Sequence, residues 1–130
     1  MKNSLNLLER SVLDKVAQGE TAALLKLRRQ IEACIVKDRS FSGYGFFTSF
    51  VVPENIPRIN DLNLKFGDVV GSIPGLDHGV GFLVYINNGV IDMLEGYSYD
   101  EPWPEHVEGF ELEYTKGAVR DWSGFPLDLQ

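Results

Sequence analysis

Apolar side chains recur at helical spacing near the start of the chain. Over residues 4–18 four of them form one stripe: Leu5, Leu8, Val12 and Val16. Positions three and four apart share one face of a helix, so an amphipathic helix is predicted there. Asn6, with Glu9 three residues later, is typical of a capping box at its start. A second helix is predicted from a Thr21 cap to about Cys34, and the short link between the two predicts an antiparallel helical hairpin.

From residue 44 the pattern changes to short segments of strand length. They are rich in aromatic and β-branched residues, or they alternate apolar with polar positions. Six are predicted as strands: residues 46–52, 62–66, 69–73, 80–86, 90–97 and 110–114. Apolar residues on both faces of segment 46–52 indicate an interior strand that is covered on both sides. Asn88-Gly89 predicts a tight type I′ turn between 80–86 and 90–97, because both central residues of that turn need positive φ.

Together these elements predict a single α+β domain over residues 1–130, an N-terminal helical hairpin packed on a mostly antiparallel sheet. The expected parts are helices over about 4–34, a sheet over about 44–115 and a tail over 117–130. Trp122 and Phe125 are large apolar side chains, so we expect the tail to dock on the domain.

Three features of the sequence bear on the cellular compartment: the number of cysteines, the charges near the N-terminus and the length of the apolar stretches. The chain has one cysteine, Cys34, so no intrachain disulfide can form, as is usual in a reducing compartment. Charged residues between Glu9 and Lys15 argue against a signal peptide. No stretch reaches the roughly 20 apolar residues of a membrane span. We therefore expect a cytoplasmic protein that does not associate with a membrane.

The formal net charge of −7 is unevenly distributed along the chain. Residues 1–65 hold ten Lys/Arg and seven Asp/Glu, a charge of +3, whereas residues 66–130 hold two Lys/Arg and twelve Asp/Glu, a charge of −10. Nucleic acid does not suit the acidic half, because phosphates need cations facing them. A basic protein partner suits it better. The alternative is a solvated acidic surface that only maintains solubility.

Glu95 is the candidate for acid–base chemistry. With a two-residue hairpin loop it stands opposite Phe82, on a face shared with Val84 and Ile86. A carboxylate there must be paired, hydrogen-bonded or protonated, and such groups serve as general acids or bases. The alternative is that Glu95 lies near the end of the sheet and reaches water or an arginine such as Arg58.

The other titratable and glycine-rich patterns indicate no cofactor chemistry. Asp77-His78, in the turn before the hairpin, is a candidate acid–base pair, although adjacent side chains seldom face each other. His78, His106 and Cys34 lack the spacing of a metal site, and Cys34 is expected to be a buried apolar residue. The glycine pairs precede strands, whereas a dinucleotide fingerprint precedes a helix. We therefore expect no metal and no cofactor.

An aromatic and acidic segment follows the hairpin. Tyr97, Tyr99 and Trp103 offer large contact areas at a small cost in rotamer entropy, as interface anchors do. Glu101 and Glu105 flank Trp103, so this segment is suited to a cationic partner. The alternative is that Trp103 folds back and covers the sheet. These five residues are the predicted binding site.

Several motifs between Arg39 and Glu105 have a distinctive amino-acid sequence. They are FSGYGFFTSF (41–50), GFLVYINNGVI (81–91), LEGYSY (94–99) and EPWPE (101–105). In these motifs, which cover about half of the chain, the sequence resembles a group of small uncharacterised bacterial cytosolic proteins that share phrases close to GxGFFTxF and LEGYTY…EPWPE. The resemblance implies a bacterial cytosolic origin and groups Glu95, Gly96, Tyr97 and Trp103 as a unit. It implies no catalytic residues.

Three functions from different classes fit these patterns. The first is a non-enzymatic binding protein that holds a protein partner with its acidic C-terminal half, as an immunity protein or an antitoxin does. The second is a small enzyme that uses Glu95, with His78 or a tyrosine, in a pocket on the sheet face. The third is a structural homodimer, in which the basic half of one chain meets the acidic half of another.

Overall fold

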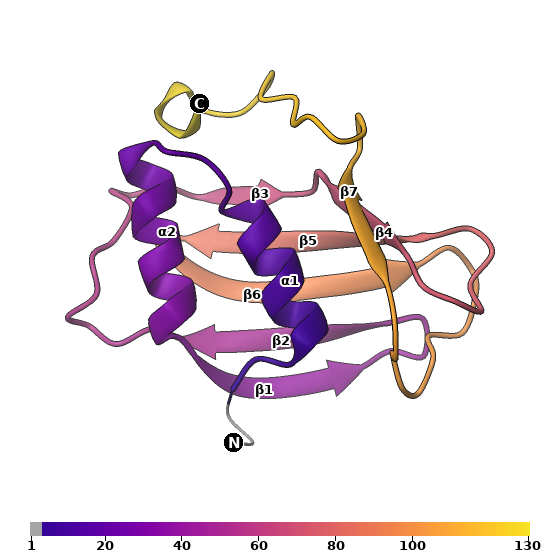
Figure 1. The fold of residues 1–130 in the computed structure, drawn as a ribbon. Coiled ribbons are helices and arrows are strands. Elements are labelled where there is room, and N and C mark those ends of the chain that lie inside the picture. Colours follow the sequence, from indigo (N-terminus) through magenta and orange to yellow (C-terminus); the bar gives the residue numbers. More distant parts are fainter. Residues whose placement is uncertain (1–3) are drawn as a thin grey trace.

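The computed structural model describes residues 4–130 and has two helices followed by an antiparallel sheet (Figure 1). The helices are α1 (Leu7–Val16) and α2 (Ala22–Ala33). The strands are β1 (Ile35–Phe41), β2 (Gly45–Val51), β3 (Leu64–Phe66), β4 (Val69–Ser72), β5 (Val80–Asn87), β6 (Val90–Ser98) and β7 (Glu111–Tyr114), and a 3₁₀ turn (Leu127–Leu129) ends the chain. The predicted α+β fold is confirmed.

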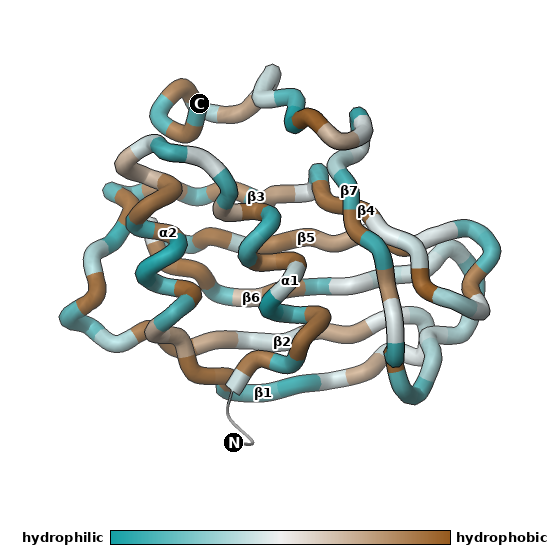
Figure 2. The backbone as a smooth tube through the Cα atoms, viewed as in Figure 1, coloured by the Kyte–Doolittle hydropathy of each residue, from teal (hydrophilic) through white to brown (hydrophobic). Residues whose placement is uncertain are grey.

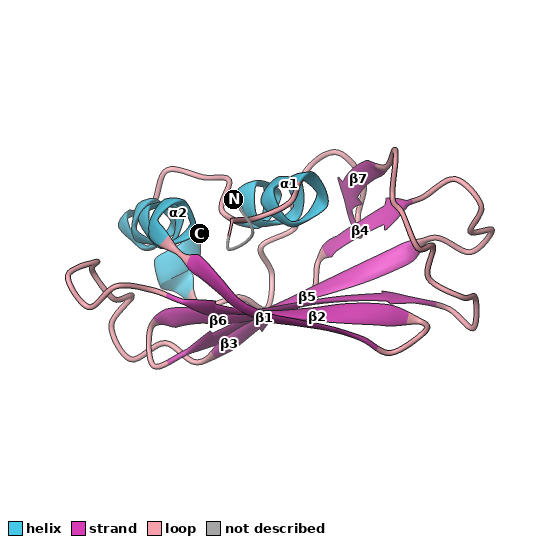
Figure 3. Cartoon of the chain, turned by 90° about the horizontal axis from the view of Figure 1, so that it is seen from below, coloured by secondary structure: helices cyan, strands magenta, loops and turns pink. Residues whose placement is uncertain are grey.

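The seven strands form one sheet, six of them in the order β1-β2-β6-β5-β4-β7. The seventh, β3, pairs with residues 84–86 of β5, on the same edge on which β4 pairs with residues 80–81. Every pairing is antiparallel. Both helices lie on the same face of the sheet, and β4 and β7 bend toward that side (Figure 3). The other face of the sheet is left open. The strands at the two ends of this order, β1 and β7, carry charged residues, and β3, which pairs only with β5, forms a third, short edge.

The helix starts are set by local hydrogen bonds, as the sequence indicates. The Asn6 side chain accepts from the Glu9 amide at 2.8 Å, and the Glu9 carboxylate accepts from the Asn6 amide at 2.9 Å, so the predicted capping box is present. The Thr21 hydroxyl caps α2 by accepting from the Leu24 amide. The first helix begins at Leu7 rather than at residue 4, because Asn6 has extended φ and ψ.

Strand β1 is the main element that the sequence pattern did not predict. The apolar stripe of α2 continues through Cys34 and Ile35, which made these residues look helical. Cys34 instead has extended dihedrals (φ −67°, ψ 152°), and the chain turns into β1 at the next residue. The middle of β1, Lys37–Ser40, is polar and appears teal at the edge of the sheet in Figure 2, so it lacks the apolar signature of a strand.

The core lies between the helices and the covered face of the sheet. Its fully buried members include Val12, Leu13, Leu27, Val84 and Leu94. Three polar side chains of the described residues are also buried, those of Glu9, Thr48 and Gln30, and Gln30 on α2 has 0% exposure. It donates to the carbonyls of Pro57 and Gly89 and accepts from the amide of Ile91, each at 2.9 Å. Gln30 thereby fixes the hairpin end of β5 and β6 to the helix layer.

The β5–β6 hairpin has the predicted turn but not the predicted register. Asn88 and Gly89 have positive φ (50° and 76°), and Asn87 pairs with Val90. A β-bulge follows: Ile86 pairs with Ile91, whereas Tyr85 pairs with Met93. Asp92 is the extra residue, and it moves every later side chain of β6 to the opposite face.

The C-terminal tail packs back across the helix side of the molecule. Arg120 forms an ion pair with Asp68 (2.7 Å) in which both side chains are largely buried. The same guanidinium lies 4.2 Å from the Trp122 ring centroid and 5.0 Å from that of Tyr114. Phe125 stacks on Phe66. These contacts hold the tail against β3, the end of β7 and the link between β3 and β4.

Across residues 4–130, neither helix combines the length and the apolar character that a membrane crossing would require.

Candidate functional site

The open face of the sheet presents apolar and aromatic side chains in three cross-strand rows. Cross-strand partners share a face, so the pairing of the strands defines these rows. They are Lys65, Tyr85, Met93, Ser49 and Asp38; Leu83, Glu95, Phe47 and Ser40; and Glu113, Val70, Gly81, Tyr97 and Gly45. We call this surface the open sheet face. The prediction that strand 46–52 is covered on both sides is wrong, because Val51 is 48% exposed and Phe47 only half-buried.

Glu95 lies at the centre of the open sheet face, not on the face of Phe82 and Val84. Its pairing with Leu83 instead of Phe82 follows from the bulge at Asp92. The Tyr85 hydroxyl donates to the Glu95 carboxylate at 2.8 Å, and the Lys65 ammonium lies 5.5 Å from the centroid of the Tyr85 ring. Partial burial raises the pKa of Tyr85, and the hydrogen bond to Glu95 raises it further because it holds the phenol proton.

Tyr97 and Tyr99 extend the open sheet face toward one end of β6. Their rings meet edge to face with centroids 5.7 Å apart. Tyr97 lies across Gly81 so closely that a Cβ atom there would be 2.4 Å from the phenol. Only glycine therefore leaves room for this ring, which fixes Tyr97 on the surface while Tyr99 stays 48% exposed.

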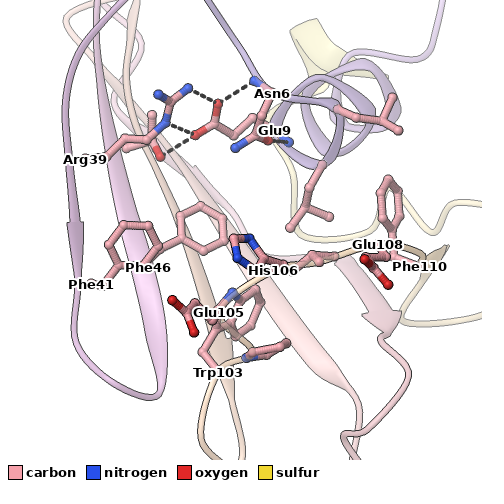
Figure 4. A pocket seen from close by; sticks show the side chains of 15 residues that line it. Asn6, Glu9, Arg39, Phe41, Phe46, Trp103, Glu105, His106, Glu108 and Phe110 are labelled. Atoms are coloured by element: carbon pink, nitrogen blue, oxygen red, sulfur yellow. Dashed lines mark hydrogen bonds and ion pairs between the residues drawn. The ribbon is translucent and has the colours of Figure 1, made fainter. Parts of the chain in front are cut away.

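Trp103 and Glu105 are on the opposite, helix-covered side of the sheet and line a cleft of about 280 Å³. The cleft lies between α1, the strands β1 and β2, and residues 103–110 (Figure 4). Trp103 is half-buried, and its ring meets Phe46 edge on at 5.4 Å. The predicted binding residues therefore do not form one site, because Tyr97 and Tyr99 belong to the other face.

Glu101 and His78, two further predicted site residues, meet in a loop contact. The Glu101 carboxylate accepts from the backbone amides of Asp77 and His78, each at 2.9 Å. These two hydrogen bonds from backbone amides lower the pKa of Glu101. Glu101 thus ties the turn before β5 to the segment after β6. In the described residues no hydrogen bond or ion pair joins His78 to Glu95.

An ion pair between the buried Glu9 and the partly exposed Arg39 closes one end of the cleft. Glu9 is 1% exposed, and its carboxylate accepts from Arg39 at 2.7 and 2.9 Å and from the Thr48 hydroxyl at 2.6 Å. Burial acts to raise the pKa of Glu9, but the bonds from Arg39, Thr48 and the Asn6 amide outweigh it, so the pKa lies below its ordinary value. The carboxylate is ionised at neutral pH with its acceptor sites occupied, which suits a structural role.

Cys34 is half-buried at the end of α2, and its thiol donates to the Ile31 carbonyl. Burial raises its pKa to about 11. A thiol that keeps its proton at neutral pH is a poor nucleophile.

Sequence reasoning missed the contacts that join distant segments. Glu9, Arg39 and Thr48 come from three separate elements, and no local pattern links them. The position of Glu95 beside Tyr85 did have a signal: Ile91 and Leu94, both buried, are three residues apart instead of two. That spacing breaks strand alternation and is typical of a bulge.

Comparison of the chain with protein-family models, with curated protein sequences and with solved structures found no match. The resemblance to a bacterial group and the cytoplasmic location therefore stay predictions, and the function has to be argued from the surfaces themselves.

Proposed function

We propose that this is a non-enzymatic binding protein whose open sheet face holds a basic protein partner, in the manner of an immunity protein or an antitoxin. The observation that carries the proposal is the position of Glu95 among half-buried aromatic and apolar side chains on the uncovered face of the sheet. Tyrosine, phenylalanine and methionine are enriched where proteins meet, and contiguous apolar patches on a protein surface often mark binding sites.

The shape of the surface favours a protein over a small ligand. A stable protein interface buries about 800 Å² on each partner, which calls for a broad surface. The three rows of the open sheet face cross most of the strands, whereas the cleft beside Trp103 encloses only about 280 Å³. Loops and helices leave the open sheet face uncovered (Figure 3).

The charge of the surface favours a basic partner. The rows carry three carboxylates, those of Asp38, Glu95 and Glu113, and one cation, Lys65. If a partner buried Glu95 without pairing it, the desolvated charge would oppose binding. An arginine of the partner would pair with Glu95 and contact the rings of Tyr85 and Tyr97. The acidic edge strand β7 would steer such a partner toward the face.

The test is a matched pair of charge reversals. Glu95→Lys alters the open sheet face, and Glu20→Lys makes the same change at an exposed position on the helix side. Proteins of the host lysate retained by the wild type would be identified, purified and titrated by calorimetry. We expect a basic partner whose affinity falls at least about 10-fold with Glu95→Lys and changes little with Glu20→Lys. The affinity for the wild type should also decrease as the salt concentration rises. Equal loss with both variants, or an acidic partner, would overturn the proposal.

A further inference from the structure

The cleft beside Trp103 is independent of the open sheet face. Its lining comes from the covered side of β1 and β2, the start of α1 and residues 103–110. A partner seated on the open sheet face therefore leaves the cleft accessible to solvent. Figure 4 shows the Glu9–Arg39 pair at one end, Trp103 at the other, and Phe41 and Phe46 between them.

The aromatic walls of the cleft are held in place before any ligand arrives. Trp103 and Phe46 meet at 66°, so their rings form a corner. The Trp103 amide donates to the Gly43 carbonyl at 2.8 Å, and prolines on both sides of Trp103 restrict the backbone. Phe41, 71% exposed, and Phe110 add further aromatic surface to the lining. Preorganised walls reduce the entropy lost on binding.

The charge of the cleft is negative. Glu9 and Arg39 cancel, since both oxygens of the Glu9 carboxylate accept from that guanidinium. Glu105 and Glu108 then leave the lining with a formal charge of −2. Both are exposed, and in the described part of the chain neither has a hydrogen bond or ion pair.

We propose that this cleft binds a free small organic cation, an ammonium group carried on an apolar or aromatic skeleton. The half-buried ring of Trp103 attracts a cation through its quadrupole, and the part of Phe46 that lines the cleft contacts the apolar skeleton. Glu105, beside Trp103, and Glu108, beside Phe110, are exposed carboxylates of the lining (Figure 4), so they attract a cation, repel an anion and offer a neutral alcohol only a hydrogen-bond acceptor. The volume of about 280 Å³ is near the lower limit for ligand pockets, which points to a small molecule.

Three probes with a similar skeleton test the charge preference: 2-phenylethylammonium, 2-phenylethanol and 3-phenylpropanoate. The Trp122→Phe variant leaves Trp103 as the sole tryptophan, so its fluorescence reports on the cleft. We expect the ammonium probe to bind at least about 10-fold more tightly than the alcohol and the carboxylate to bind least. Equal affinity for all three, or no binding of the ammonium probe at millimolar concentration, would overturn the proposal.

Two double variants with the same change of charge assign the site. Glu105→Gln with Glu108→Gln should remove the preference for the ammonium probe, whereas Glu111→Gln with Glu113→Gln on β7 should keep it. Glu95→Lys should leave probe binding unchanged, which separates this result from the proposed partner site. An equal effect of both double variants, or much tighter binding of a lysine-containing peptide than of the free ammonium, would contradict a small-molecule site.

Discussion

Glu9 brings a negative charge into the interior and meets four donors there. They are two nitrogens of Arg39, the Thr48 hydroxyl and the Asn6 amide. One side chain therefore completes the capping box of α1 and joins that helix to β1 and β2. The helix cap was predictable because it is local in sequence. The ion pair was not, because it joins residues 30 positions apart.

The lowered pKa of Glu9 makes stability depend on pH. In the unfolded chain the pKa returns to its ordinary value of 4.5, and in the folded protein it is lower. The ionised carboxylate thus contributes its full stabilisation above about pH 4.5, and this is lost as the pH falls through the folded-state pKa. We expect Glu9→Gln to reduce the free energy of unfolding by about 2 kcal/mol at pH 7. This difference in stability between the wild type and the variant should become smaller toward pH 3.

Urea unfolding of the wild type and of Glu9→Gln at pH 7, 5, 4 and 3 measures this difference in unfolding free energy. Asp14→Asn, an exposed carboxylate on the same helix, is the control and should have a much smaller effect. A difference for Glu9→Gln that stays constant between pH 7 and pH 3 would show that Glu9 is not held ionised in the folded state.

At the scale of elements, the bulge in β6 decides which residues face solvent. Both helices, the hairpin turn and the strand near the end of the chain follow from periodicity, caps and Asn88-Gly89, which are local signals. The bulge has only a weak local signal, the spacing of Ile91 and Leu94, and it is supported by a distant residue, because Gln30 of α2 accepts from the Ile91 amide beside it. Alternation counted from the turn therefore placed Glu95 on the wrong face.

Deletion of Asp92 tests this explanation. Without the extra residue, Met93 follows Ile91 directly and can keep its pairing with Tyr85, so regular alternation leaves Leu94 in the core and Glu95 on the open sheet face. We expect the deletion variant to fold and to lose at most about 2 kcal/mol of unfolding free energy, because every buried side chain of β6 keeps its place and only the bulge and the Asn87–Asp92 hydrogen bond are lost. Asp92→Ala keeps the bulge and should cost less than about 1 kcal/mol.

Thermal and urea unfolding followed by circular dichroism compare the two variants with the wild type. If the deletion variant failed to fold or lost more than about 4 kcal/mol, Asp92 would not be the extra residue of the hairpin, and the location of the proposed partner site would have to be revised.

At the scale of the whole molecule, charge bears on self-association. Two copies meeting through their open sheet faces would bring together the carboxylates of Asp38, Glu95 and Glu113, and the net charge of −7 adds repulsion at long range. We therefore expect the isolated protein to be monomeric at about 20 mM salt, where electrostatic effects are least screened. Sedimentation equilibrium measures this directly. A dimer at low salt that dissociates at high salt would instead support the homodimer hypothesis.

The charged edge strands β1 and β7 have a consequence for how recognition can change over evolutionary time. Strand β1 carries Lys37, Asp38 and Arg39 with a bulge, and β7 carries Glu111 and Glu113, all of which oppose the addition of a foreign strand. The third edge strand, β3, has only three residues. Recognition on the open sheet face then relies on side chains, whereas strand addition relies largely on the shared backbone. Single substitutions on that face can change the partner while the core and the fold stay the same, so related chains could diverge rapidly in specificity.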